Sequence, residues 1–318
     1  NNQWGLSTPS REQFNFDSFL VKGPAYGMEA HSIDGNNILD VYRKAKELTE
    51  SMRENPRPVL LECKTFRVRG HEEASGTKYY PEGLIDAWSE RDPVDAFGAF
   101  LEKKKWLSAK ERETWKQEEK EAIQQALEDA LLEPEPVWDE AAERADLFAP
   151  SPASVTPAPN ASSKEMRLID AISDGLRESM RRHPELVLMG QDIGAYGGVF
   201  KVTDGFVNEF GAERVRNTPL CEAAILGAGL GLSVRGMKAM VEMQFSDFVT
   251  EGFTQIVNNL AKIHWRWGQQ ADVVVRMPTG AGVAAGPFHS QSTEAWFAHT
   301  PGLKVVYPAF PADAKGLL

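Results

Sequence analysis

A segment rich in proline and alanine divides this chain of 318 residues into two blocks. Prolines occur at positions 134, 136, 150, 152, 157 and 159, among small and acidic residues. A segment of this composition does not bury a core, because proline lacks an amide donor and small side chains remove little apolar surface from water. We therefore predict a semi-extended linker over residues 134–163, between folded domains at residues 1–133 and 164–318.

The composition excludes several classes of protein. Hydrophobic residues make up 42% of the chain and charged residues 25%, which is typical of globular domains. The net charge is −11 without a dense basic face, so we expect no nucleic-acid partner. The chain contains no run of about 18 apolar residues, and we expect no membrane span. The two cysteines, Cys63 and Cys221, are too few for a disulfide framework and favour a cytoplasmic location.

Both ends of the sequence look cut. The chain starts at Asn1 without an initiator methionine or the charged and apolar regions of a signal peptide. Residues 313–318 read as a helix interrupted after its first turn. We expect the chain to be a piece of a longer protein.

The first block mixes helix and strand signals. Asn37 precedes apolar residues at helical spacing and is expected to cap a helix, and residues 59–66 have the pattern of a buried strand. Asp92 followed by proline predicts the start of another helix. Ser108 and Glu111 form a capping box that predicts a long charged helix.

The second block alternates short apolar strands with helices. We expect helices at residues 168–180, 223–234 and 253–260, and strands at residues 186–189, 240–243, 273–275 and 305–306. This alternation favours a parallel sheet covered by helices on both faces. The predicted fold class is α/β.

Ligands of such folds bind beyond the carboxyl ends of the strands, and two segments of the first block are candidates. Residues 1–9 carry side-chain amides and loop carbonyls, which are hard oxygen ligands suited to Mg²⁺ but also common in simple turns. Arg67, Arg69 and His71 follow the predicted strand. They are suited to a diphosphate, and equally to a solvated charged loop.

Two further candidates lie in the second block. Glu222 starts an almost wholly apolar helix, where a carboxylate is costly unless it is paired. It is either an acid that exchanges a proton with a buried ligand or a charge that caps the helix. His289 follows a glycine-rich loop, where it can act as acid, base or hydrogen-bond donor, or serve a structural role.

Taken together, these segments resemble the decarboxylating first component of 2-oxo acid dehydrogenase complexes, which depends on thiamine diphosphate. In the first block, the similarity to the C-terminal part of the α subunit lies in residues 1–9, 23–27, 33–36, 64–71 and 91–93. In the second block, the similarity to the N-terminal domain of the β subunit lies in residues 190–192, 196–200, 218–222, 242–248, 275–278, 289–292 and 297–302. The order of the two blocks resembles a fusion of α and β subunits, each with a thiamine diphosphate-binding type of domain.

The resemblance implies that the α-like block holds the diphosphate of the cofactor and Mg²⁺. The side chain of Asn2 and the carbonyl of Trp4 match metal ligands, Leu6 matches a cofactor contact and His71 matches a catalytic residue. The family's pattern also has an aspartate upstream of the Asn-Asn pair, outside this sequence, so we expect the chain alone to be incomplete for metal and cofactor binding. Glu72 stands where some family members carry a regulatory serine, so we expect no phosphorylation switch.

The β-like block, by the same resemblance, holds the pyrimidine of the cofactor. Glu222 matches the glutamate that hydrogen-bonds the aminopyrimidine, and Leu220, Gln244 and Phe248 match its pocket. His289 matches an active-site histidine. The C-terminal domain of the β subunit has no counterpart in this sequence.

The implied reaction is oxidative decarboxylation of a 2-oxo acid, with acyl transfer to the lipoyl group of a partner acyltransferase. Glu222 is expected to share a proton with the pyrimidine, and His289 and His71 to stabilise developing charge. We expect a branched-chain 2-oxo acid as substrate, with pyruvate or acetoin as alternatives, because no side chain reports the chain length of the acid. A homo-oligomer is expected, since the family's site forms between α-like and β-like domains. An alternative from a different functional class is that the chain acts only as a structural or docking module.

Overall fold

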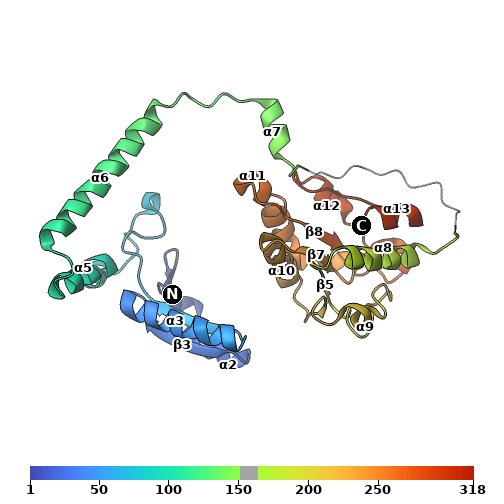
Figure 1. Cartoon of the computed structure of the whole chain (residues 1–318), viewed down its shortest axis with the longest axis horizontal. Coiled ribbons are helices and arrows are strands. Elements are labelled where there is room, and N and C mark those ends of the chain that lie inside the picture. Colours follow the sequence, from blue (N-terminus) through green and yellow to red (C-terminus); the bar gives the residue numbers. More distant parts are fainter. Residues whose placement is uncertain (151–163) are drawn as a thin grey trace. The chain divides into compact units, whose positions relative to one another are not determined.

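The computed structural model describes residues 1–150 and 164–318, which form two compact units, Asn1–Glu135 and Pro136–Leu318 (Figure 1). Residues 151–163 of the predicted linker lie outside the described part of the chain. Within the rest of it, helix α7 spans Glu140–Asp146. Asp139 caps this helix by accepting hydrogen bonds from two backbone N–H groups, and glutamate and alanine follow it as good helix formers. The prediction of a semi-extended backbone is therefore wrong for this stretch.

The first unit is built around a two-stranded parallel sheet. Its elements are β1 Trp4–Gly5, β2 Thr8–Pro9, α1 Ser10–Gln13, η1 Phe19–Val21, α2 Lys22–Ala25, β3 Glu29–Asp34, α3 Ile38–Glu54, β4 Val59–Lys64, η2 Glu73–Ser75, α4 Leu84–Ser89, α5 Pro93–Lys103 and α6 Ala109–Leu132. Strands β3 and β4 pair in register from Glu29 opposite Val59 to Asp34 opposite Lys64. Helices α2 and α3 both pack against β3.

The predicted helix starts of this unit are confirmed. The Asn37 side chain accepts from the N–H groups of Leu39 and Asp40 at the start of α3, and Asp92 caps α5 in the same way. Ser108 and Glu111 form the complete capping box of α6. The predicted strand at residues 59–66 ends two residues earlier, at Lys64, where its pairing with β3 stops.

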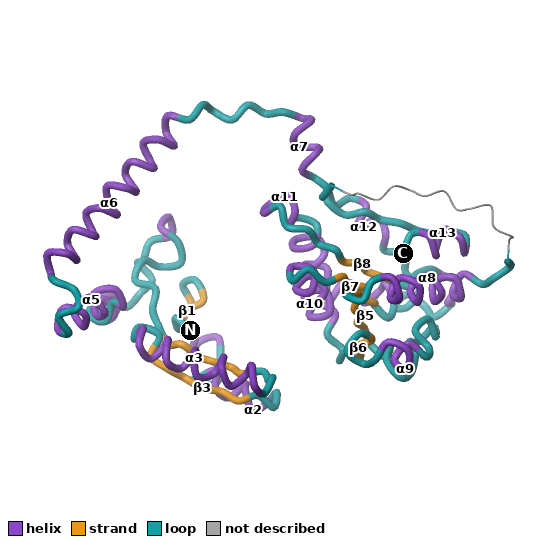
Figure 2. Tube along the Cα trace, viewed as in Figure 1, coloured by secondary structure: helices purple, strands orange, loops and turns teal. Residues whose placement is uncertain are grey.

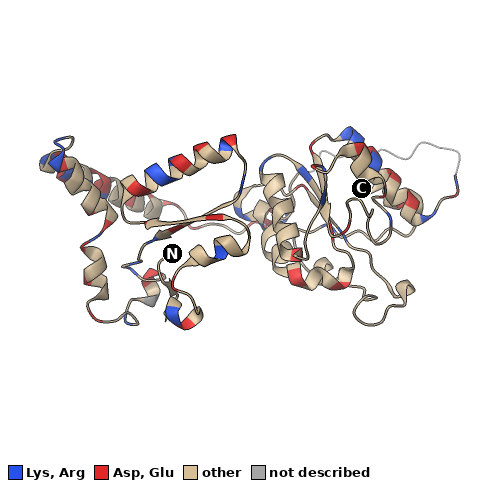
Figure 3. Cartoon of the chain, turned by 90° about the horizontal axis from the view of Figure 1, so that it is seen from below, with Lys and Arg blue, Asp and Glu red and all other residues tan. Residues whose placement is uncertain are grey.

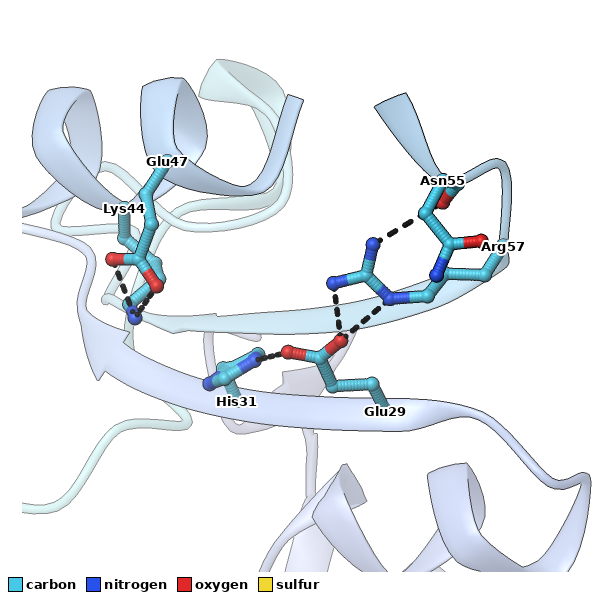
Figure 4. Close-up of polar contacts among 6 residues, drawn as sticks. All are labelled: Glu29, His31, Lys44, Glu47, Asn55 and Arg57. Atoms are coloured by element: carbon cyan, nitrogen blue, oxygen red, sulfur yellow. Dashed lines mark hydrogen bonds and ion pairs between the residues drawn. The ribbon is translucent and has the colours of Figure 1, made fainter. Parts of the chain in front are cut away.

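A cluster of charged side chains joins the first residues of β3 to the segment that leads into β4 (Figure 4). Glu29 accepts from Nε and Nη2 of Arg57 at 2.8 and 2.6 Å and contacts Nε2 of His31 at 2.6 Å. The hydrogen bonds from His31 and Arg57 hold the pKa of Glu29 below its usual value. This cluster lies at the edge of the sheet where the parallel strands begin. It is therefore on the opposite side from the carboxyl ends of the strands.

The second unit contains a four-stranded parallel sheet in the order β6-β5-β7-β8 (Figure 2). Its elements after α7 are α8 Leu168–Arg182, β5 Leu186–Gly190, α9 Phe206–Phe210, β6 Val215–Asn217, α10 Glu222–Val234, β7 Lys238–Glu242, η3 Ser246–Gly252, η4 Gln255–Leu260, α11 Ile263–Trp267, β8 Val273–Arg276, η5 Ala281–Val283, α12 Glu294–Ala298 and α13 Pro311–Gly316. The predicted α/β class with a parallel sheet is confirmed for this unit.

Both faces of this sheet are buried. Alternate residues of β5 point to opposite faces, so that Leu188 joins one apolar cluster and Val187 joins another. The first cluster includes Phe206 and side chains of α8, and the second includes Leu226 of α10. A strand that is apolar at every position therefore suits this central place in the sheet.

Two predicted elements of the second unit differ in the structure. Residues 305–306 form no strand, and the side chains of Val305 and Val306 are exposed, because they pair with no strand and the described sheet ends at β8. The helix predicted at residues 253–260 is present, but Gln255–Leu260 form a π-helix, η4, and the helix follows directly on the 3₁₀ segment η3. Gly252 lies so close to Leu226 that any Cβ at this position would clash, and the backbone here follows the surface of α10.

Figure 3, in which the ribbon is coloured by residue type, shows basic and acidic positions interspersed along several helices. In α3, for example, Lys44 donates to both carboxylate oxygens of Glu47 at 2.9 Å. Among the described residues, none of the helices has the length and apolar character needed to cross a bilayer.

Candidate functional site

The predicted metal ligands lie on a tight hairpin at the start of the first unit. Strands β1 and β2 pair so that Trp4 lies opposite Pro9, and Gln3 and Leu6 adopt the left-handed backbone conformation, with φ of 65° and 57°. One terminal atom of the Asn2 amide lies 2.9 Å from the carbonyl oxygen of Trp4. The other lies 3.0 Å from Nη2 of Arg67.

The two orientations of the Asn2 amide present different atoms to the Trp4 carbonyl and to Arg67. Without a metal, the amide nitrogen is best placed toward the Trp4 carbonyl and the oxygen toward Arg67. A half-turn of the amide presents two oxygens 2.9 Å apart, which is about the spacing of neighbouring ligands in an octahedron with Mg–O bonds of about 2.05 Å. The described residues contain no cluster of three or more His, Cys, Asp or Glu side chains suited to a metal, so a cation here would rely on amide and carbonyl oxygens.

Arg67 brings the hairpin and the predicted catalytic His71 together. Its Nη1 lies 3.4 Å from Nδ1 of His71, while Nη2 faces Asn2. The backbone carbonyl of Arg67 accepts from the Tyr80 hydroxyl at 3.1 Å. Burial, together with a hydrogen bond to Tyr79, raises the pKa of Tyr80 to about 12, so that the hydroxyl keeps its proton and remains a donor.

The other residues predicted for this half of the site are at the surface. Leu6 forms the turn of the hairpin and is 55% exposed, so its apolar side chain is open to a ligand. Arg69 pairs with Glu73 at 2.7 Å, and both side chains are exposed. The structure therefore assigns Arg69 to a surface ion pair, whereas Arg67 lies at the site.

Glu222 is the first residue of α10 and is buried. Its Oε1 accepts from Nε2 of Gln191 at 2.8 Å, and Gln191, which follows β5, is also buried. The sequence predicts a role for Glu222 but none for Gln191. The position of Gln191 indicates one, because a glutamine directly after a wholly apolar strand lies at the carboxyl edge of the sheet.

Two buried polar atoms at the carboxyl ends of β5 and β6 lack a hydrogen-bond partner. They are Oε1 of Gln191 and Oγ1 of Thr218, which follows β6. The N–H of Thr218 donates to the carbonyl of Gly190 at 3.0 Å. Gln191 and Thr218 therefore lie at the ends of adjacent strands. Buried polar groups are normally satisfied, so this pair indicates a place where a polar ligand or water completes the hydrogen bonding.

The predicted residues His289 and Phe248 are in contact. The ring of His289 lies edge-on to Phe248 and Phe245, with centroid distances of 5.3 and 5.0 Å. Aromatic packing on two sides restrains the imidazole. Gln244, also predicted for the pocket, donates from Nε2 to Oδ2 of Asp192 at 2.9 Å.

Hydrogen bonds hold the loop of His289 against η3. The carbonyl of Gln291 accepts from the hydroxyls of Ser246 and Thr279 at 3.0 and 2.7 Å. Its N–H donates to the buried carboxylate of Asp247 at 3.2 Å. Leu220, by contrast, is 82% exposed in the turn before α10, so its side chain is available to a ligand.

The two units match two known domain types. Residues 1–138 match the family described as "Dehydrogenase E1 component", and residues 164–318 match "Transketolase, pyrimidine binding domain". Both are domain types of thiamine diphosphate-dependent enzymes. The chain is thus similar to an E1 dehydrogenase component over its first part and to a pyrimidine-binding domain over its second part.

The relatives of the second unit are β subunits of 2-oxo acid dehydrogenases. The 2-oxoisovalerate dehydrogenase subunit beta of Bacillus subtilis is 48% identical over 155 residues, which cover 48% of this chain and 47% of that protein. The mitochondrial subunit beta of Dictyostelium discoideum is 46% identical, covering 50% of this chain and 44% of that protein. The pyruvate dehydrogenase E1 component subunit beta of Leifsonia xyli is 43% identical, covering 53% and 50%. The chain therefore spans about half the length of these relatives.

Proposed function

We propose that this chain is part of the decarboxylating first component of a 2-oxo acid dehydrogenase, with an α-like and a β-like part fused in one polypeptide. Support comes from the order of the two matched domain types, residues 1–138 and then 164–318, in a single sequence. We favour a branched-chain 2-oxo acid as substrate because 2-oxoisovalerate dehydrogenase subunits are among the most similar relatives. Pyruvate is the second candidate, supported by a relative of 43% identity.

The observation that carries this proposal is the buried carboxyl of Glu222 among polar atoms that lack partners. Glu222 has Gln191 on one oxygen, and Oε1 of Gln191 and Oγ1 of Thr218 remain unsatisfied. An aminopyrimidine carries both donors and acceptors, so it suits such a set of groups. Bound thiamine diphosphate supplies the electron sink for decarboxylation, and the protein supplies orientation and proton transfer.

The residues of this chain then have distinct roles. Glu222 shares a proton with a ring nitrogen, which requires a carboxyl group at hydrogen-bond distance. His289, restrained by two phenylalanines, donates a hydrogen bond to the reacting group. His71, which stands beside Arg67, stabilises developing charge.

The remaining predicted residues bind rather than react. Asn2 and the carbonyl of Trp4 hold Mg²⁺, and the exposed side chain of Leu6 contacts the cofactor. In the second unit Leu220, Gln244 and Phe248 line the pyrimidine site. The acyl product passes to the lipoyl group of a partner acyltransferase, and the enzyme works as a homo-oligomer.

The test is cofactor binding followed by turnover. Thiamine diphosphate is titrated by calorimetry, in the presence of Mg²⁺, into the complete enzyme that contains this chain, and ferricyanide reduction is then measured with 3-methyl-2-oxobutanoate and with pyruvate. We expect binding and faster reduction with the branched acid. Faster reduction with pyruvate would reassign the substrate.

A matched pair of variants makes this test specific. Glu222→Gln changes the buried carboxyl, and Glu213→Gln changes a glutamate whose side chain is 87% exposed. Only the first is expected to abolish turnover. If the unaltered complete enzyme neither binds the cofactor nor reduces ferricyanide but captures a lipoyl acyltransferase, the alternative of a docking module replaces the proposed enzyme.

A further inference from the structure

Glu62 is a buried carboxylate in the middle of strand β4, between apolar neighbours. The residue is 4% exposed and pairs in register with Ser32 of β3. Burial raises its pKa, but hydrogen bonds from Ser18, Asn1 and the N–H of Phe19 outweigh this, and the net pKa lies below the usual 4.5. A buried charge needs such donors to be tolerated.

Besides Ser32 of the neighbouring strand, the donors to Glu62 come from two segments that precede the sheet in the sequence. Oε1 accepts from Nδ2 of Asn1 at 2.7 Å and from the N–H of Phe19 at 3.3 Å. Oε2 accepts from the Ser18 hydroxyl at 2.5 Å. Ser18 in turn caps the short helix η1 by accepting from the N–H of Leu20. One carboxylate therefore binds the first residue of the chain and the start of η1.

The backbone of Asn1 is held to the same strand. Its carbonyl accepts from the N–H of Thr65 at 3.0 Å, directly after β4. Asn2 and Trp4 follow within three residues, so the position of Asn1 sets the position of the amide and the carbonyl that face each other. Short hydrogen-bonded loops transmit such restraints because few backbone dihedrals lie between the anchor and the site.

We propose that Glu62 is a positioning residue that holds the Asn1–Trp4 loop on the end of β4 and so presents Asn2 and the Trp4 carbonyl as a pair. This inference rests on the proposed metal role of those two groups. Glu62 itself does not touch the metal.

The hydrogen-bond geometry predicts how substitutions behave. Glutamine at this position can accept on Oε1 from Asn1 and Phe19, and its Nε2 can donate to the Ser18 hydroxyl, which is also an acceptor. Leucine has a similar size but leaves three donors unsatisfied. Glu62→Gln should therefore preserve the loop, and Glu62→Leu should release it.

The first test is hydrogen exchange of the hairpin amides, followed by mass spectrometry on the chain itself. We expect residues 2–10 to exchange at least about tenfold faster in Glu62→Leu and within about threefold of the unaltered rate in Glu62→Gln. Glu29→Gln is the control, because Glu29 holds a charged cluster at the start of β3 (Figure 4) and its change should leave the hairpin unaffected. Unchanged exchange of residues 2–10 in Glu62→Leu overturns the proposal.

A second variant covers the case in which Glu62→Leu does not fold. Asn1→Asp keeps the side-chain oxygen that accepts from the N–H of Gln3 at 3.0 Å but removes the donor to Glu62, and should accelerate exchange of residues 2–10 by about threefold or more. Exchange at the unaltered rate in this variant would count equally against the anchoring role.

The third measurement concerns the metal. Mn²⁺ is titrated into the complete enzyme in the presence of thiamine diphosphate, and its binding is followed by electron paramagnetic resonance. We expect the dissociation constant to rise at least about tenfold in Glu62→Leu and to be restored in Glu62→Gln. If the unaltered complete enzyme binds no Mn²⁺, the proposed metal role of Asn2 and Trp4 fails, while the exchange measurement still decides whether Glu62 holds the loop.

Discussion

Gln191 donates a hydrogen bond from Nε2 to Oε1 of Glu222 across 2.8 Å, and both side chains are buried. The neutral amide can serve either form of the carboxyl group, since it donates to a carboxylate and, after a half-turn, accepts from a carboxylic acid. A partner of this kind suits a residue that gains and loses a proton during a reaction. The relationship also explains how a carboxyl group is tolerated beside the apolar residues of α10.

Changing Glu222 to glutamine separates the catalytic and capping roles. Glu222→Gln keeps the size and a hydrogen bond but removes proton transfer, so in the complete enzyme we expect turnover to fall by about 10²–10⁴ while folding is retained. If the side chain serves only as a charge at the start of α10, the loss is about 1 kcal/mol of stability with normal turnover. Thermal melts and steady-state kinetics on this variant distinguish the two outcomes.

Removing Arg276 should destabilise the second unit strongly. Arg276 donates from Nε and Nη2 to Oε2 of Glu242 at 2.9 and 2.5 Å, and the side chains are only 13% and 3% exposed. Arg276→Met leaves Glu242 buried without its partner, which costs about 3–5 kcal/mol. The double variant Glu242→Leu with Arg276→Met should recover most of this loss, because it removes the buried charge as well. Calorimetric unfolding measures the stability of the single and of the double variant. Equal stability of these two variants would contradict this account.

The pH dependence of the first unit should change when Glu62 is replaced. The folded pKa of Glu62 lies below its usual 4.5, so its contribution to stability is complete above that value. The contribution is lost as the pH falls through the folded pKa, because the unfolded chain then binds the proton more readily. We expect the stability difference between the unaltered chain and Glu62→Gln to shrink on acidification below about pH 4.5. Denaturant titrations at several pH values check this, and Glu29 titrates equally in both proteins. A difference that is constant from pH 6 to 3 would show that Glu62 is not the cause.

Gly302 should tolerate substitution less well than Gly211. Both have positive φ, 90° and 83°, so alanine strains the backbone at either position by about 1–3 kcal/mol. At Gly302 a Cβ would also meet the carbonyl oxygen of Ala261 at 2.0 Å, whereas at Gly211 the space is open. We therefore expect Gly302→Ala to lower the melting temperature clearly more than Gly211→Ala. Equal shifts would indicate that the conformation alone, and not the close approach, requires glycine at position 302.

Local patterns in the sequence were enough to predict those features that depend on neighbouring residues. Asn37, Asp92 and Ser108 cap helices because each accepts from N–H groups two or three residues ahead, and this geometry needs no distant partner. The apolar run at residues 186–189 predicts a central strand because both faces of a parallel sheet are buried. Residues 305–306 show the limit of this reasoning, since a strand also needs a neighbour that presents free backbone groups.

The sequence alone determined the α/β class of this protein and the residues able to carry its chemistry. Only the tertiary structure decided which of them meet, because Gln191 and Glu222, or Glu62 and Asn1, lie far apart along the chain and approach only when strands and helices pack. The same holds for Arg67, which faces Asn2 and His71, while Arg69 pairs at the surface. A linear pattern shows which residue types are present, but the direction of each side chain depends on strand register and burial, which are properties of the whole fold.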